Sequence, residues 1–234
     1  MAKIEMTSSG ATFFSVLSDG KFHHSVEEGH PGATKREYEL KDGTKGFKWE
    51  ITANSIEGMI SGVSTKEGEF GKQLHIAFAG DASDDKTVVI SLNLASNFAE
   101  DFLKKLPNIN VDKEVKLVPY SFEDETTKKT KRGITVYQDG QKINGYYHEM
   151  KADKKSGKET LHPINGYPEV PKESKTWDSD DWKIYFTQAR KFLVAQLEKH
   201  PLYNATYIKA MEEGNKVEYP KNENPDAEIT FDNL

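Results

Sequence analysis

The apolar and polar positions of the chain change their period several times, and each change predicts an element. Residues 1–32, rich in Ser, Gly and His, show no sustained period and are predicted to form an irregular arm. Residues 35–40 alternate, residues 41–44 (KDGT) supply a turn, and residues 47–51 alternate on the return. Because an Asp-Gly pair between two alternating runs is a strong hairpin signal, we expect a β-hairpin here.

A series of strand signals follows, interrupted once by a helix. Residues 56–65 are β-rich with two internal glycines, which in a strand mark a bulge or strong coiling, and residues 74–78 and 88–94 alternate. At Ser96 the period changes to 3.6, with Ser96 as N-cap and Pro107 as the end of the helix. Residues 115–122 and 133–138 then predict two more strands.

This order of elements predicts a fold class. Three meander strands, a helix and two further strands is the order of the five-stranded OB barrel, in which the helix lies between strands three and four. We therefore predict a mainly β protein, with an OB-fold domain and its N-terminal hairpin extension over residues 33–150. An unrelated small barrel or an α+β sheet would show the same order.

The chain changes character after Met150. Residues 151–178 hold six Lys, three Pro and two Gly, and are predicted to form a linker or an ordered loop. Residues 179–211 are predicted to be a helical region with a wide apolar stripe, made of Trp182, Tyr185, Phe186, Ala189, Phe192, Leu193 and Leu197. We expect this amphipathic helix to pack on the barrel or, in a homodimer, on a second copy of itself. Residues 212–234 are polar and acidic, and we expect a disordered tail.

Composition and charge narrow the class of protein. The chain has 234 residues and no cysteine, which excludes a disulfide framework, a thiolate nucleophile and a cysteine zinc site. No apolar run is long enough for a signal-peptide core or a membrane-spanning helix.

The net charge of −6 is unevenly distributed. Residues 212–234 carry seven acids against two lysines, whereas residues 126–158 carry nine Lys or Arg against three acids. A basic middle and an acidic end point toward a nucleic-acid partner or toward contacts made by the tail.

Catalytic motifs are missing from the sequence. It lacks the HExxH, GxSxG, P-loop, EF-hand and GxGxxG patterns. The histidines and glutamates of residues 23–30 match no metal-ligand spacing, and the aspartates of residues 178–181 suit a helix N-terminus. We therefore predict no enzymatic activity, no cofactor and no metal, with an accessory nuclease as a minor alternative.

Basic residues interleaved with aromatic residues are the features that suggest a function. Unpaired bases stack on flat aromatic rings while cations follow the phosphates. In an OB fold these groups lie on strands two and three and in the loops joining strands one to two and four to five. The alternative for each residue is a core aromatic or a solvated lysine. The predicted DNA-binding residues are Lys48, Trp49, Lys66, Phe70, Lys72, His75, Tyr120, Phe122, Lys128, Lys129, Lys131, Arg132 and Tyr137.

The acidic tail adds a second functional element. It carries the predicted partner-binding residues Asp226, Glu228, Phe231 and Asp232. A flexible acidic segment with an aromatic near its end can imitate nucleic acid and occupy the protein's own groove, or dock into a basic pocket of another protein. The alternative is a tail that only keeps the protein soluble.

Together these segments resemble a known family. The stretch from about Phe47 to Tyr147, with KEGEFGKQLHIAF, SNFAEDFLKKLPN, VKLVPYSFED and KRGITVYQDG, is similar to phage-encoded OB-fold single-stranded-DNA-binding proteins. The resemblance implies sequence-independent binding of single-stranded DNA in phage replication, recombination or repair, in the host cytoplasm, with the tail contacting a polymerase or helicase. The competing hypothesis is an OB-like protein-interaction module of a phage or bacterial assembly that does not bind DNA.

Overall fold

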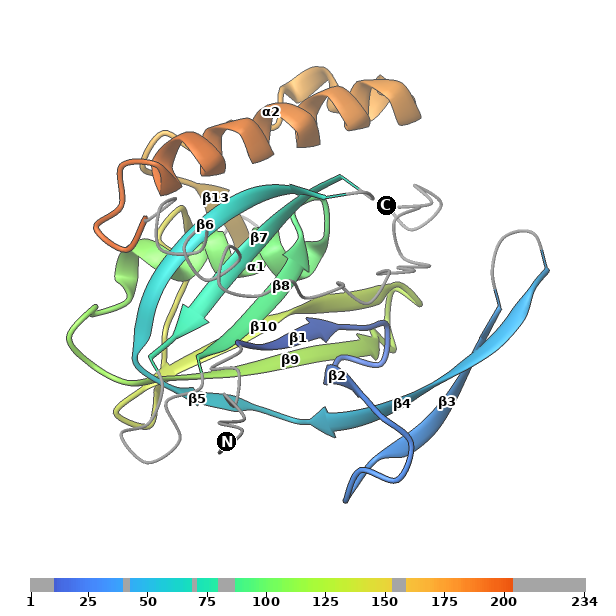
Figure 1. The fold of residues 1–234 in the computed structure, drawn as a ribbon. Coiled ribbons are helices and arrows are strands. Elements are labelled where there is room, and N and C mark those ends of the chain that lie inside the picture. The colour runs from blue at the N-terminus through green and yellow to red at the C-terminus, as the bar shows by residue number, and fades with distance from the viewer. Residues whose placement is uncertain (1–10, 40–42, 69–70, 80–86, 153–158, 204–234) are drawn as a thin grey trace, which may run out of the picture.

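A seven-stranded mixed sheet is the largest element of the protein (Figure 1). The computed structural model describes residues 11–39, 43–68, 71–79, 87–152 and 159–203. The strand order in the sheet is β3-β4-β2-β1-β8-β7-β6, and all neighbours are antiparallel except β1 and β8. The strands are β1 (Thr12–Val16), β2 (Phe22–Val26), β3 (Thr34–Glu39), β4 (Lys45–Ala53), β6 (Ile60–Gly68), β7 (Gly71–Phe78) and β8 (Val88–Asn93).

The remaining strands of the described residues form two smaller sheets. The first has the order β11-β10-β9-β5, with β5 (Ile56–Gly58), β9 (Val115–Glu123), β10 (Thr130–Gln138) and β11 (Gln141–Lys142). Only Met59 separates β5 from β6, so one bent segment contributes to both sheets. The second is the hairpin of β12 (His148–Ala152) and β13 (Glu159–Pro163).

Each of the two α-helices in the described residues begins at a side-chain cap. Helix α1 (Asn97–Lys105) begins after Ser96, whose hydroxyl accepts a hydrogen bond from the Ala99 N–H, and it runs into the 3₁₀ turn η1 (Leu106–Asn108). Helix α2 (Ser179–Leu197) follows the 3₁₀ turn η2 (Lys172–Thr176) and is capped by Asp178, which accepts hydrogen bonds from the N–H groups of Asp180 and Asp181. No described helix combines the length and the apolar character that crossing a membrane would require.

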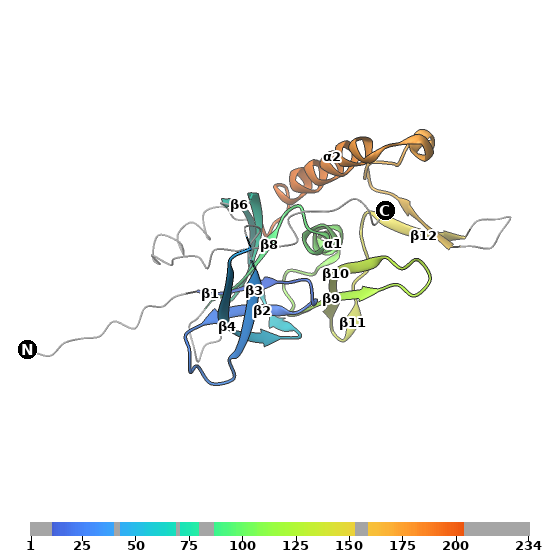
Figure 2. The ribbon, with the colours of Figure 1, turned by 90° about the vertical axis from the view of Figure 1, so that its right-hand side faces the viewer.

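The mainly β class predicted from the sequence is confirmed, but the described strands do not close a barrel. Strand β8 pairs with β1, so its edge is not available to β10. Helix α1 lies at this seam, between the two sheets (Figure 2). The Asp101 carboxylate accepts the Ile134 N–H at 2.9 Å, and the Lys105 ammonium donates to the Ile134 carbonyl at 2.6 Å. Two helix side chains thus satisfy backbone groups of β10 that a neighbouring strand would otherwise pair.

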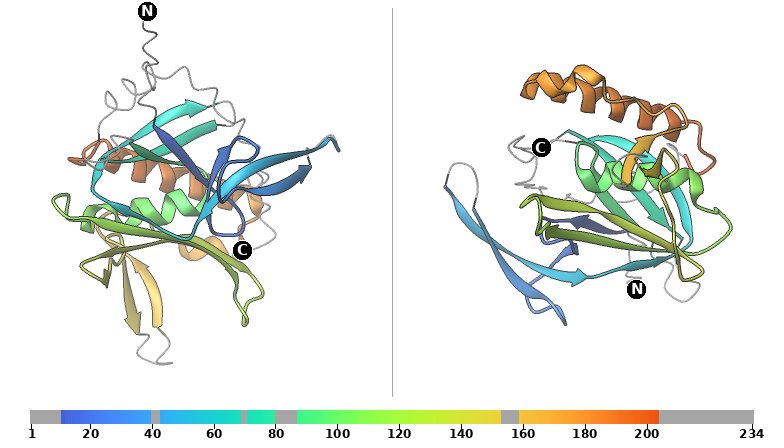
Figure 3. Two further views of the ribbon diagram at one scale, coloured as in Figure 1. Left: turned by 60° about the horizontal axis from the view of Figure 1, so that its bottom comes forward. Right: turned by 180° about the vertical axis from the view of Figure 1, so that it is seen from behind.

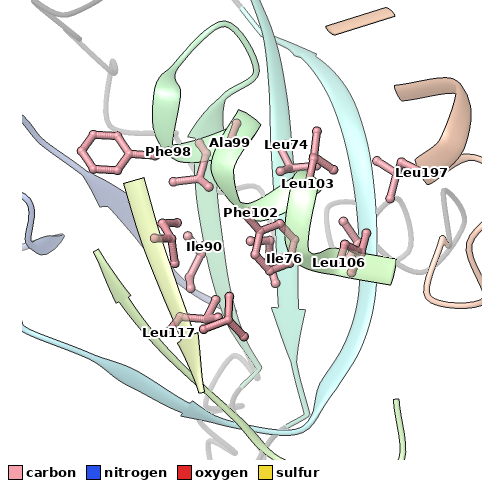
Figure 4. Close-up of a cluster of buried hydrophobic side chains, with 14 of the residues drawn as sticks. Leu74, Ile76, Ile90, Phe98, Ala99, Phe102, Leu103, Leu106, Leu117 and Leu197 are labelled. Carbon is pink, nitrogen blue, oxygen red and sulfur yellow. The ribbon is translucent and has the colours of Figure 1, made fainter. Parts of the chain in front are cut away.

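The core lies between α1, the large sheet and the β9–β10 hairpin. Figure 4 shows Phe102 of α1 beside Ile76 and Ile90 of the large sheet, with Leu117 of β9 close by. All four of these side chains are fully buried. This is the apolar face that the alternation of the strands and the 3.6 period of the helix predict.

The N-terminal arm and the segment after Met150 contain more regular structure than the sequence indicates. The prediction of an irregular arm is wrong for residues 12–16 and 22–26, which form β1 and β2. Within residues 151–178, predicted as a linker or loop, the chain forms β13 and η2. Helix α2 lies along the body of the same chain (Figure 1). Its residues Ala189, Leu193 and Leu197 are buried, and Phe192 packs against Tyr147 and Tyr167. Residues 212–234, the predicted acidic tail, lie outside the described residues.

Candidate nucleic-acid interface

The face of the β9–β10 hairpin that points away from the core gathers aromatic and basic side chains. Cross-strand pairs on this face join Lys116 to Tyr137, Val118 to Thr135, Tyr120 to Gly133 and Phe122 to Lys131. Their side chains are exposed or half-buried except at Gly133, whereas Val115, Leu117, Ile134 and Val136 on the opposite face are buried. We call these four pairs the β9–β10 strip.

One end of the strip is aromatic and partly fixed in place. The rings of Tyr120 and Phe122 lie 5.8 Å apart, and Phe122 is 52% exposed. The Tyr120 hydroxyl donates to Asp101 at 3.4 Å, and Gly133 leaves room for this hydroxyl, since a β-carbon there would collide with it. Burial and the charge of Asp101 raise the pKa of Tyr120 to about 12, so the ring stays neutral at physiological pH. Tyr120 is thereby held beneath a more accessible Phe122.

The other end of the strip places a tyrosine between lysines. Tyr137 pairs with Lys116 of β9 on one side and with Lys142 of β11 on the other. Tyr137, Lys116 and Lys113 also line an open hollow of about 780 Å³. Three carboxylates line the same hollow. A half-buried ring with a lysine opposite it on each neighbouring strand offers a stacking surface with cations nearby.

Carboxylates of the same chain already pair with the lysines of the strip and its borders. Lys131 pairs with Asp124, Lys128 with Glu123 at 4.0 Å, Lys116 with Glu57 at 3.6 Å and Lys113 with Asp139 at 2.5 Å. Exposed pairs of this kind stabilise a fold by only about 0–1 kcal/mol. A phosphate can therefore replace a carboxylate at each lysine at little cost in folding free energy.

Asp124 shapes the loop between β9 and β10. Its Oδ1 atom accepts hydrogen bonds from the N–H groups of Thr126 and Thr127 at 3.1 and 2.8 Å, while its Oδ2 atom pairs with Lys131. The hydrogen bond from Lys131, followed by those from Thr127, holds the pKa of Asp124 well below its usual range. The loop and the ion pair thus use different oxygens of one carboxylate.

The structure brings together only some of the predicted DNA-binding residues. Tyr120, Phe122, Lys131 and Tyr137 lie on the strip, and Lys128 borders it. Lys129 is half-buried in the loop, and Arg132 lies on the other face of β10, where its Nε donates to the Ser121 hydroxyl at 3.4 Å.

Other predicted residues lie elsewhere. Lys66 and Lys72 belong to the β6–β7 end of the large sheet, which Figure 2 shows on the opposite side from the β9–β10 hairpin. Lys48 and Trp49 belong to β4, where the Lys48 ammonium lies 5.2 Å from the centre of the Tyr38 ring. Phe70 and the tail residues Asp226, Glu228, Phe231 and Asp232 lie outside the described residues.

The prediction for His75 is wrong as an exposed contact, because this side chain is only 2% exposed. It shares a face of β7 with Ala77, and the partner of Ala77 in the ladder is Val89; both are fully buried. Strand β1 lies beside β8 and brings Phe13 into line with Val89, and the Phe13 ring lies 6.1 Å from that of His75. The outer face of strands two and three, where an OB fold would bind nucleic acid, is therefore buried around His75.

Lys113, Lys116 and Lys142 were not among the residues predicted from the sequence. A usable signal was present for Lys116, because the alternation of VKLVPYSF puts it on the same face as Tyr120 and Phe122. Lys142 is brought to Tyr137 by the short β10–β11 turn. Lys113 precedes β9 and reaches the site through the fold alone.

Comparison with known proteins adds no relative to this description. The chain matches no protein-family model, no curated protein and no solved structure.

Proposed function

We propose that this protein is a non-enzymatic, sequence-independent single-stranded-DNA-binding protein. The observation that carries the proposal is the β9–β10 strip, with Tyr120 and Phe122 at one end, Tyr137 at the other and lysines beside both. Each base that stacks on an aromatic ring contributes about 1–3 kcal/mol, and stacking is tolerant of sequence because every base has a flat face. From Tyr137 to Lys131 the strip spans six residue steps along β10, or about 20 Å at ~3.4 Å per step. A few nucleotides of a single strand would fit along it.

We propose further that the fold is OB-like. The connectivity supports this, because the bent β5–β6 segment pairs with β7 on one side and with β9 on the other, α1 follows β8, and β9 pairs with β10. That is the arrangement of strands one to five with the helix after strand three. In this proposal α1 fills the seam that strands three and five close in a complete barrel.

The acidic tail would compete with DNA for the strip. Its carboxylates Asp226, Glu228 and Asp232 would replace phosphates at the lysines, and Phe231 would replace a base or dock into a partner protein. We propose that this activity serves phage DNA replication, recombination or repair in the host cytoplasm, as the resemblance to phage proteins implies, with a polymerase or helicase as the partner of the tail.

Fluorescence anisotropy with a labelled oligonucleotide of about 20–30 nucleotides tests the binding site. Phe122→Ala is expected to weaken binding about 5- to 150-fold, the range that loss of one base stack of about 1–3 kcal/mol gives. Phe47→Ala is the matched control, because Phe47 is 53% exposed but lies on the β3–β4 hairpin away from the strip. Affinity should fall steeply as salt rises. Equal loss in both variants, or binding that ignores salt, would contradict the proposed site.

Deletion of residues 223–234 tests the role of the tail separately. Removal of its negative charge is expected to raise DNA affinity at low salt and to change it little at high salt. An unchanged affinity would eliminate competition by the tail and leave the binding proposal standing.

A protein-interaction module is the second candidate function. It is favoured by α2, where Ile184 is 59% exposed next to a cluster formed by Trp177, Trp182, Tyr185 and Phe186. A titration with single- and double-stranded probes, with and without Mg²⁺, separates the candidates. A shift without cleavage supports DNA binding, no shift at about 50 mM salt supports the interaction module, and cleavage would support the accessory nuclease.

A further inference from the structure

The β12–β13 hairpin carries an apolar pair on one face. It projects from the body of the molecule in two different views (Figures 2 and 3). Met150 of β12 and Leu161 of β13 lie directly opposite each other in its ladder and are 58% and 60% exposed. Two-stranded sheets with an uncovered apolar face are marginally stable in water. Such a hairpin gains most by adding further strands.

One edge of this hairpin is suited to pairing. Among the described residues β12 pairs with β13 alone, so every second residue of β12 directs its N–H and C=O away from the ladder. The outer edge of β13 is less suitable, because Pro163 at its end lacks an N–H donor. The edge of β12 contains no proline or glycine.

We propose that two copies of the chain pair through β12, antiparallel, about a two-fold axis that passes midway between Met150 of one copy and Met150 of the other. An axis perpendicular to the hairpin keeps the same face upward in both copies, as a continuous antiparallel sheet requires. Met150 then lies opposite Met150 of the second copy. Glu149 lies opposite Lys151 of the second copy, and Lys151 lies opposite Glu149, so both charged positions meet the opposite charge.

Both faces of the resulting four-stranded sheet favour this register. On one face Leu161 and Met150 of each copy form a continuous apolar row, with strands about 4.8 Å apart. On the other face Glu149 and Lys151, which pair at 2.5 Å within one chain, each gain a second partner of opposite charge. Opposite charges in directly facing positions stabilise antiparallel strands, whereas like charges destabilise them.

The interface is small, and its affinity is correspondingly weak. It joins two five-residue strands, well below the roughly 1,200 Å² of a standard interface. A dimer is therefore expected at high micromolar protein, or at lower concentrations where many copies are held on one strand of DNA. The association itself does not depend on DNA binding.

Sedimentation velocity at about 10 μM to 1 mM protein, with charge variants of the full chain, tests the proposal. Glu149→Lys places Lys opposite Lys, and Lys151→Glu places Glu opposite Glu, so each variant alone should be monomeric. An equimolar mixture of the two variants should dimerise again, because every facing pair is then Lys with Glu. The double variant should also dimerise, and Glu169→Lys, an exposed change outside the hairpin, should behave as the unmodified chain does.

Restored association in the mixture would show that neither variant is misfolded, because each component carries one of the two substitutions and is monomeric on its own. A chain that stays monomeric at 1 mM, or two single variants that fail to complement each other when mixed, would overturn the proposal. Dimerisation that survives Glu149→Lys would equally overturn it and would direct attention to α2 as the interface.

Discussion

Replacement of Glu50 by Gln is expected to destabilise the protein by about 2–3 kcal/mol near pH 6. Glu50 is buried in β4, where its carboxylate accepts two hydrogen bonds from Arg36, at 2.7 and 2.8 Å, and lies 3.0 Å from Nδ1 of His23. The other ring nitrogen of His23 lies 3.0 Å from Asp19. This network joins β2, β3 and β4 at the base of the β3–β4 hairpin.

The magnitude follows from the pKa of Glu50. Burial alone would raise this pKa, but hydrogen bonds and charge from His23 and Arg36 outweigh burial and lower it from 4.5 to about 2. At ~1.4 kcal/mol for each pKa unit this corresponds to about 3 kcal/mol of folding free energy, taken as an upper value. Breaking a buried ion pair on one side typically costs a similar amount, about 3–5 kcal/mol.

The pH dependence has a defined sign. Because the folded pKa of Glu50 is lowered, its contribution is present above about pH 4.5 and is lost as the pH falls toward 2. Burial alone would lower the pKa of His23, but Glu50 and Asp19 raise it, so the contribution of His23 is present below about pH 6.5 and is lost as the pH rises through the raised value. The stability difference between the original chain and Glu50→Gln should therefore be greatest between about pH 5 and 6.5.

Urea denaturation at pH 6 and pH 3 measures this difference. Glu37→Gln is the control, because Glu37 is an exposed carboxylate on the same hairpin. A loss below about 0.5 kcal/mol at pH 6, the range of ordinary surface substitutions, would refute the argument. So would a loss that is as large at pH 3 as at pH 6, because below about pH 4.5 the unfolded chain binds a proton at Glu50 and the stabilisation that the folded carboxylate provides becomes smaller.

Three further predictions concern the strip and the core. Asp124→Asn keeps an oxygen for the Thr126 and Thr127 N–H groups but removes the charge beside Lys131, so DNA affinity in anisotropy titrations should rise about two- to fivefold at low salt; an unchanged affinity would show that Lys131 does not contact phosphate. Gly133→Ala puts a β-carbon against the Asp101 carboxylate and the Tyr120 hydroxyl and should cost about 1–3 kcal/mol in urea denaturation, against no loss if the helix seam is loose. Leu193→Ala should lower the free energy of unfolding by about 2–4 kcal/mol because Leu193 lies on the buried face of α2, whereas Ile184→Ala on the exposed face should lower it by less than about 0.5 kcal/mol. Equal losses would show that the face of α2 assigned to the core is not the buried one.

Local patterns in the sequence predicted most of the elements between Lys45 and Gln138. The alternation of Leu74, Ile76 and Phe78 identified the face of β7 that contacts the core, and the switch of period at Ser96 located the start of α1. Both signals arise within one element, so they can be recognised without knowing how that element pairs or packs with the rest of the chain.

The elements that local patterns did not predict depend on pairing between distant segments of the chain. Strands β1 and β2 are five residues each, and β1 is stabilised by parallel pairing with β8, more than seventy residues away in the chain. The five residues of β1 (TFFSV) contain no pattern that identifies β8 as their pairing partner. The alternation correctly placed His75 opposite the core stripe, but it could not show that this second face of β7 is also buried, with Phe13 of β1 beside His75.

The polar side of α1 links the architecture to the proposed function. From the sequence, Asp101 and Lys105 are an ordinary i, i+4 pair on a solvated helix face. In the structure Lys105 is buried, both side chains bond to Ile134 of β10, and the Asp101 oxygen that accepts the Ile134 N–H also accepts the Tyr120 hydroxyl. One carboxylate therefore fixes the edge of β10 and the inner ring of the strip at once. A change at Asp101 should then loosen the seam and weaken DNA binding together, whereas a change at Phe122 should weaken binding alone.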